Sequence, residues 1–208
     1  MAGIMNLPKG TGKRLGSSET PYSNKEALKN GISYITGTGA RKDKTEVVWY
    51  ETFGLDSNPQ TAVIQMETVQ NFYGIERRKG RRAYHLIYTI SNDEYRKMGC
   101  NTAWIKEYAY CLGNYFYSLG YQTVVALHDN FILNGFKEND GLEELRFHID
   151  IFISNVSFYN GSKLNYTRSD QSKYQMLYQK DIQTVQSQSA VIFQDTEEIN
   201  KKIYGHTT

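Results

Sequence analysis

The sequence predicts an α+β fold in which a mostly antiparallel sheet carries helices on one face. Apolar residues at helical spacing alternate with short runs that favour β-structure, in the order helix, strand, helix, strand, helix, strand, strand, helix. The last two strands have no helix between them, which excludes a simple doubly wound parallel sheet. A chain of 208 residues is long enough to bury one proper core.

The N-terminal part predicts a tail followed by a helix. Residues 1–20 are rich in Gly, Lys, Ser and Thr without periodicity, which is typical of a flexible basic arm. Ser23, with Glu26 three residues later, forms a capping-box pattern, so we expect a helix from Asn24 to about Ile35.

Tyr34 lies off the apolar stripe of this predicted helix. The residues at helical spacing that would face the core are Leu28, Ile32 and Ile35. Tyr34 falls on a different side, so it is either a plain surface ring or a ring presented to a partner.

A strand, a helix and two basic loops are expected next. Residues 46–53 favour β-structure, and Pro59 opens a helix with the apolar stripe Ala62, Met66, Val69 and Phe72 or Tyr73. Cations cluster in a loop before the strand and in a loop after the helix. These cations either face solvent or bind DNA phosphates. The two clusters comprise Arg41, Lys42, Lys44, Arg77, Arg78, Lys79, Arg81 and Arg82.

Three further elements bring two histidines into the predicted sheet. Residues 83–91 form a strand that carries His85, for which a buried core histidine is the simpler interpretation. Residues 102–119 follow helical spacing, and the strand at 121–127 leads directly to His128.

The strand over residues 145–153 carries the strongest functional signal. It alternates strictly up to Asp150, so apolar residues line one face while Arg146, His148 and Asp150 share the other. These polar residues could simply face solvent. However, consecutive strands usually pair, which would bring His128 to His148 and Asp150. Two imidazoles and a carboxylate suit a divalent metal ion.

The remaining sequence sets the expected domain limits and excludes several classes. We expect one domain over residues 21–193, ending with a helix near 172–186, and a linker at 194–208 to a C-terminal region beyond this chain. The net charge is only +2, so any nucleic-acid-binding surface must be local. No apolar run approaches the ~20 residues of a membrane span, and the two cysteines fit no metal or redox spacing. These features indicate a soluble cytoplasmic protein without a membrane partner.

Four stretches resemble the HUH relaxases, the plasmid mobilisation nucleases, in their order and spacing. They read LKNGISYI at 28–35, AYHLI at 83–87, VVALH at 124–128 and HIDIFISNVSF at 148–158, the last followed by NGSKL at 160–164. The final stretch is similar to that of MobA/MobL-like relaxases of Gram-positive bacteria, where a His pair precedes an Asn-containing apolar segment and a Gly-Lys turn. The resemblance spans roughly residues 22–190.

The resemblance implies a fold and an activity. The fold would be a five-stranded antiparallel sheet of the RRM-like HUH palm type with flanking helices. The activity would be nicking of one DNA strand at a plasmid transfer origin, where a tyrosine attacks the scissile phosphate and becomes joined to the 5′ phosphate. Partners would be single-stranded and duplex DNA in the bacterial cytoplasm, with accessory relaxosome proteins and a coupling protein as further candidates.

The resemblance also implies roles for individual residues. Tyr34 matches the nucleophile, and His85 matches a second catalytic histidine with an acid–base or supporting role. His128, His148 and Asp150 match the three metal ligands, although the family normally has a third histidine in place of Asp150. A hard oxygen ligand favours Mn²⁺ or Mg²⁺ over softer ions.

Two alternatives remain open at this point. The chain could be a non-catalytic RRM-like DNA-binding module that stacks bases on its tyrosines. It could also be a rolling-circle replication initiator, which usually places its tyrosine after the metal-binding strand, here at Tyr174 or Tyr178. Tyr22 is a rival nucleophile within the relaxase interpretation.

Overall fold

The computed structural model describes residues 5–6, 26–39, 46–75, 80–90, 95–96, 99–129 and 147–164. All of them belong to one compact unit, Met1–Asn165. The second unit, Tyr166–Thr208, lies outside the described residues, as do the helix expected near 172–186 and the linker expected at 194–208. The described helices are α1 (Ala27–Ile35), α2 (Pro59–Phe72) and α4 (Ala103–Ser118), and the strands are β1 (Met5–Asn6), β2 (Glu46–Phe53), β3 (Ala83–Ile90), β4 (Tyr121–Asp129) and β5 (Phe147–Ser157).

Four long strands form an antiparallel sheet in which β5 lies between β3 and β4, and β2 flanks β4. The two-residue β1 pairs with β3 at the other edge, so the segment expected as a flexible arm contributes this short pairing. The antiparallel sheet and its α+β class are confirmed. The expected five-stranded sheet is not shown: the described residues form four long strands, and no fifth strand of that length occurs among them.

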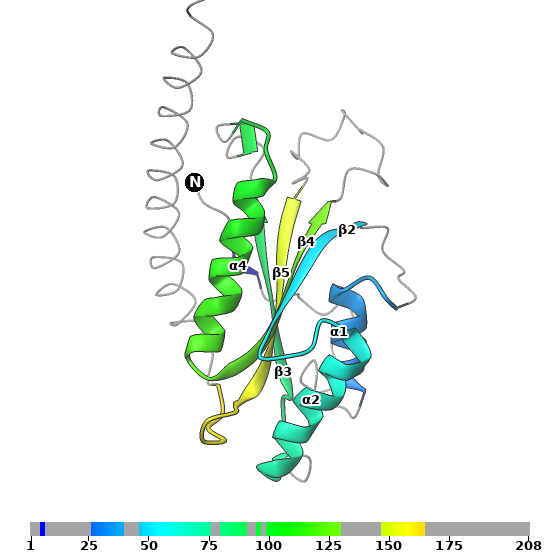
Figure 1. Ribbon diagram of the computed structural model, residues 1–208, viewed down its shortest axis with the longest axis vertical. Helices are drawn as coiled ribbons and strands as arrows, with labels where there is room; N and C mark the ends of the chain where they lie inside the picture. Colours follow the sequence, from blue (N-terminus) through cyan, green and yellow to red (C-terminus); the bar gives the residue numbers. More distant parts are fainter. Residues whose placement is uncertain are drawn as a thin grey trace, which may run out of the picture. The chain divides into compact units, whose positions relative to one another are not determined.

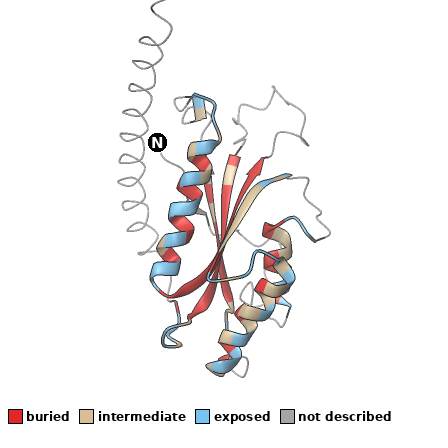
Figure 2. Ribbon diagram, in the orientation of Figure 1, coloured by how far each residue is buried: buried red, intermediate tan, exposed pale blue. Residues whose placement is uncertain are grey.

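Helices cover both faces of this sheet, which corrects the expectation of helices on one face. In Figure 1, α4 lies on one side of the strands and α1 with α2 on the other. The rings of Tyr88 on β3 and Tyr108 on α4 are 5.2 Å apart between centroids, whereas Phe152 on β5 packs in a core with Leu28 of α1 and Met66 of α2. Every residue of β4 is buried, as Figure 2 shows for the central strands. The two-sided burial explains the uninterrupted apolar runs at 124–127 and 151–153.

The first two helices follow the predicted apolar spacing with one change. Leu28, Ile32 and Ile35 of α1 are fully buried, as expected, while the predicted cap Ser23 lies outside the described residues. In α2 the Asn58 side chain accepts hydrogen bonds from the first-turn N–H groups. The buried stripe of α2 then continues at four-residue spacing and contains Ala62, Met66 and Gln70. The expected end of that stripe is therefore wrong, and Phe72 is 81 % exposed.

A glycine allows α1 to pack tightly on β5. A Cβ built on Gly31 would lie 2.2 Å from Cε2 of the buried Phe152 ring. We therefore expect Gly31→Ala to destabilise the fold by about 1–3 kcal/mol, even though alanine favours helix by up to ~1 kcal/mol. The midpoint of urea unfolding measures this loss. Asn30→Ala, at an exposed position of the same helix, is the matched control, and equal midpoints for the two variants would contradict the packing argument.

Candidate active site

Strand register brings three of the predicted site residues to one spot. His128 on β4 lies directly opposite His148 on β5, and their ring centroids are 5.0 Å apart. Asp150 follows two residues later on the same face of β5. On the other side of β5, Asp150 lies opposite Ile87 of β3, so His85, two residues away from Ile87, is its diagonal neighbour.

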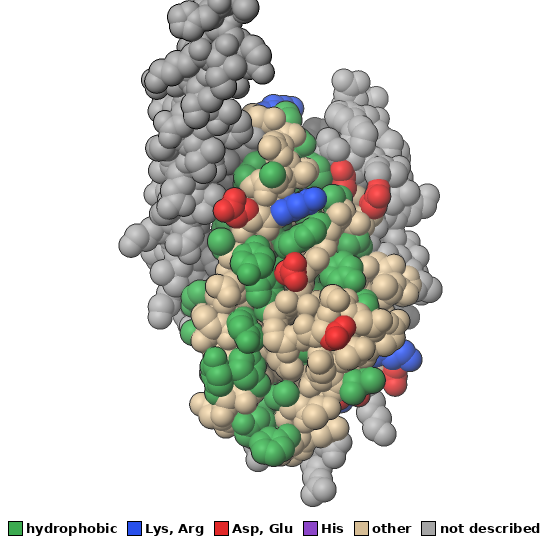
Figure 3. Space-filling model, in the orientation of Figure 1, with side chains coloured by type: hydrophobic (Ala, Val, Ile, Leu, Met, Phe, Trp, Pro, Cys, Tyr) green, Lys and Arg blue, Asp and Glu red, His purple; other side chains and the backbone are tan. Residues whose placement is uncertain are grey.

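The carboxylate of Asp150 is the centre of this cluster. Its Oδ2 lies 3.0 Å from Nδ1 of His128, and its Oδ1 lies 3.3 Å from Nε2 of His85. Nε2 of His148 is 3.9 Å from the same Oδ1. Asp150 and His128 are fully buried, while the His148 side chain keeps 12 % exposure. Figure 3 shows one face of the molecule, and no histidine of the described residues is visible on that face. The interpretation of these groups as solvent-facing charge is therefore excluded.

A backbone contact fixes the tautomer of His128. Its Nε2 lies 3.0 Å from the carbonyl oxygen of Ile35, at the end of α1. A carbonyl can only accept, so Nε2 carries the hydrogen and Nδ1 of the neutral ring presents a lone pair to Asp150. A lone pair and a carboxylate oxygen 3.0 Å apart repel each other unless a proton or a metal ion lies between them.

The donor set fits a divalent metal. One ligand atom from each of His128, His148 and Asp150 lies within 4.8 Å of the others. Nδ1 of His128 and both carboxylate oxygens are buried, and none makes a hydrogen bond to a described residue. An octahedral ion with bonds of about 2.1 Å separates adjacent ligand atoms by about 3.0 Å, close to the His128–Asp150 spacing. The hydrogen bond from His128 to Ile35 is the outer support that metal-bound imidazoles commonly have.

Electrostatics keep Asp150 ionised despite its burial. Burial alone would raise the pKa of Asp150, but the neighbouring imidazoles of His85 and His128 hold that pKa well below the usual range. A carboxylate whose charged form is favoured in this way is available as a cation ligand.

Tyr34 stands against the same cluster from α1. Its ring centroid is 5.7 Å from that of His85 and 6.1 Å from that of His128, both with edge-on geometry. Tyr34 is half-buried, whereas Ile35 beside it is fully buried and contacts His128 through its carbonyl. The side of α1 that carries Tyr34 therefore faces the polar end of the sheet, which explains why this ring lies off the apolar stripe.

The predicted DNA-binding cations fall into two groups. Arg81 and Arg82 are half-buried at the start of β3, where Arg81 stacks over the Tyr84 ring at 4.5 Å. The others lie outside the described residues, and they are Arg41, Lys42, Lys44, Arg77, Arg78 and Lys79. The rival nucleophiles Tyr22, Tyr174 and Tyr178 also lie outside them.

Sequence reasoning missed two residues that organise the site and its surroundings. The Ile35 carbonyl, which orients His128, leaves no sequence signal because any residue supplies a carbonyl. Gln70 is fully buried and bonds the start of β3. It could have been found, because it lies four residues after Met66 on the buried stripe of α2.

The comparisons with known proteins agree with this geometry. A family model described as relaxase, MobA/VirD2-like, nuclease domain, matches residues 34–183. No curated protein and no solved structure matches the chain. Among the helices that the structure describes, none has the length and apolarity needed to span a membrane.

Proposed function

Because this chain belongs to the MobA/VirD2-like relaxases through its nuclease domain, we propose how its own residues perform the reaction of that family. The chain is a DNA relaxase, a site-specific endonuclease and transesterase that acts at a transfer origin. The proposal concerns the nucleophile, the residues that hold the metal ion and the surfaces that bind DNA.

We propose Tyr34 as the nucleophile, and the observation that carries this is its position against His85 and His128. The Tyr34 hydroxyl oxygen attacks the scissile phosphorus and forms a bond to the 5′ phosphate. The bond from phosphorus to the 3′ oxygen breaks, and that oxygen leaves as the 3′ hydroxyl after taking up a proton. A tyrosine hydroxyl has an ordinary pKa of about 10, so its proton needs an acceptor. His85, whose ring is 5.7 Å from that of Tyr34, is the proposed acceptor.

His128, His148 and Asp150 are proposed to hold a divalent ion, with Mn²⁺ or Mg²⁺ favoured by the carboxylate. A bound ion supplies positive charge that offsets the charge developing on the phosphate oxygens. The chain itself orients His128 through Ile35 and keeps Asp150 ionised. Burial of the cluster limits the approach of bulk water, and His148 is its partly exposed member.

The DNA contacts, further partners and location are also proposals. Basic segments before β2 and after α2 would bind the phosphate backbone, since single-strand binding releases counterions for each neutralised phosphate. They comprise Arg41, Lys42, Lys44, Arg77, Arg78, Lys79, Arg81 and Arg82. Accessory relaxosome proteins and a coupling protein are proposed partners in the bacterial cytoplasm. The catalytic domain is proposed to cover residues 21–193.

The metal requirement tests the proposal. The protein is incubated with labelled single-stranded DNA from its own plasmid's origin, with Mn²⁺, with Mg²⁺ and with chelator. We expect a protein–DNA adduct that survives SDS with either ion and disappears in chelator, because the ligand cluster cannot offset the phosphate charge without a cation. Adding Mn²⁺ in excess should restore it.

Other outcomes would favour the alternative functions. DNA that is bound without forming an adduct in any metal would support a non-catalytic DNA-binding module. An adduct whose DNA-linked peptide contains Tyr174 or Tyr178 would support a rolling-circle initiator. Equal adduct yields in chelator and in Mn²⁺ would contradict the proposed metal centre.

A further inference from the structure

A buried side-chain amide joins the start of β3 to α2 by hydrogen bonds. Gln70 is fully buried, and its Nε2 donates to the carbonyl oxygen of Arg82 at 2.8 Å and to Oγ of Ser154 at 3.2 Å. In return, Nε of Arg82 donates to Oε1 of Gln70 at 2.8 Å. Burying an amide is costly unless its hydrogen bonds are made, and here both ends of the amide serve to hold Arg82.

The neighbouring strand holds the same two arginines from the other side. The backbone N–H of Asn155 donates to the carbonyl of Arg82 at 3.1 Å, and the Asn155 side-chain amide donates to the carbonyl of Arg81. The guanidinium of Arg81 then stacks over the Tyr84 ring. A long cationic side chain normally loses much rotamer freedom on binding, and the stacking of Arg81 and the bond from Arg82 to Gln70 restrict that freedom in advance.

A lysine from the turn after β5 lies near the residue that precedes the two arginines. The Lys163 ammonium lies 3.9 Å from the point where a Cβ on Gly80, the sequence neighbour of Arg81, would stand. Its own segment is fixed, because Lys163 bridges to Val156. Among the described residues, no carboxylate forms an ion pair with any of these three cations. These three cations thus come from the start of β3 and the turn near it without a described counter-charge, and unpaired cations of this kind attract anions.

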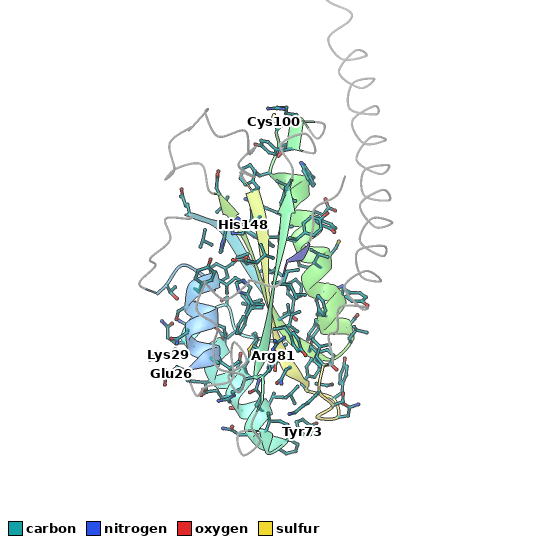
Figure 4. All side chains as sticks on the ribbon, turned by 180° about the vertical axis from the view of Figure 1, so that it is seen from behind. Glu26, Lys29, Tyr73, Arg81, Cys100 and His148 are labelled. Atoms are coloured by element: carbon teal, nitrogen blue, oxygen red, sulfur yellow. The ribbon has the colours of Figure 1, made fainter. Side chains whose placement is uncertain are left out.

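The three cations, called here the β3-start patch (Arg81, Arg82 and Lys163), lie at a defined distance from the cluster around Asp150. Arg82 is three residues from His85 along β3, which corresponds to about 10 Å of strand. The β1 pairing covers only Ile87 and Tyr88, so among the described residues no strand pairs with the outer edge of residues 83–86. In Figure 4, Arg81 and Tyr73 lie toward one end of the sheet and His148 toward the other.

We propose that the β3-start patch is a second phosphate-binding site, which holds the backbone of the cleaved strand about three to four nucleotides from the scissile phosphate. The number follows from a spacing of about 3.4 Å per nucleotide in a stacked strand. The proposal rests on the proposed function for the position of the scissile phosphate. It adds Lys163 to the DNA-binding surface and makes Gln70 the residue that positions Arg82.

A truncation series tests this. The full chain is titrated with single-stranded origin oligonucleotides shortened one nucleotide at a time on either side of the nick. We expect affinity to drop when the third or fourth nucleotide on one side is removed, and not on the other side. For the variant Arg81→Ala with Lys163→Ala, the difference in affinity between long and short oligonucleotides should shrink, because Arg82 is the one cation of the patch that remains. The slope of log K against log salt should fall in magnitude by about 1.4, at about 0.7 per phosphate contact on a single strand.

Lys29→Ala is the matched control, because this exposed lysine is already paired with Glu26 at 3.6 Å. Its salt slope and length dependence should equal those of the wild type. Thermal unfolding of each variant checks that the fold is retained. A double variant that keeps both the wild-type salt slope and the drop at the third or fourth nucleotide would overturn the proposal.

The binding series is run in chelator, so cleavage does not enter the measurement. If length-dependent binding is weakened in the double variant while no adduct forms under any condition, the second phosphate site stands and the proposed chemistry fails. If adducts form but binding shows no one-sided length dependence, the chemistry stands and the second site fails.

Discussion

Tyr34→Phe is expected to abolish the SDS-resistant protein–DNA adduct, with a loss on the order of 10⁴-fold or more in the rate of adduct formation. The substitution removes only the oxygen that is proposed to attack the phosphate. The ring can keep its edge-on contacts with His85 and His128, so the proposed metal ligands and α1 should stay in place. DNA binding measured by fluorescence anisotropy should change little, which separates a lost nucleophile from a lost substrate site.

Tyr110→Phe is the control for this substitution. Tyr110 lies on α4, on the opposite face of the sheet, and packs its ring on Phe53 at 5.0 Å. Its loss of a hydroxyl should leave adduct formation at the wild-type rate. If Tyr34→Phe still forms the adduct, the nucleophile lies elsewhere, and sequencing the DNA-linked peptide would distinguish Tyr22 from the tyrosines after the metal-binding strand.

Much of this architecture could be predicted from periodicity. The strands at 46–53, 83–90 and 121–129 and the helix at 103–118 lie within two residues of their expected limits, because each has an apolar pattern with a Gly close to one end. The separation of Tyr34 from the buried stripe was visible in the same way. So was the face shared by His148 and Asp150, which depends only on the alternation of a strand.

The errors have a common physical origin, which is that a pattern along one element does not show what packs against it. Strict alternation in the first half of β5 suggested one wet face, but α1 and α2 cover that face, and Asp150 is fully buried. The stripe of α2 was extended to Phe72 because Phe is apolar, whereas the inward position belongs to Gln70. A polar residue fits at this buried position because it makes hydrogen bonds to Arg82 and Ser154. These partners come from segments distant in sequence, so no local pattern reveals them.

Asp150→Asn is expected to weaken metal binding by at least about 100-fold, beyond the usual cost of losing an outer-shell partner. The amide keeps the shape of the side chain but removes the negative charge that lies 3.0 Å from the His128 lone pair. The readout is metal-induced stabilisation in thermal unfolding. At a metal concentration 100 times the wild-type Kd, the wild type should gain about 2.7 kcal/mol, and the variant about 0.4 kcal/mol.

Asp129→Asn is the control, because Asp129 adjoins His128 in sequence but alternation places it on the other face of β4. Its metal-induced stabilisation should match that of the wild type. A second variant, Asp150→His, tests what the carboxylate contributes beyond occupying the site. An imidazole should shift the preference from Mg²⁺ toward Co²⁺, Ni²⁺ or Zn²⁺. If Asp150→Asn instead retains full stabilisation by Mn²⁺, Asp150 serves only to balance the charge of the histidines, and the ion must be held without it.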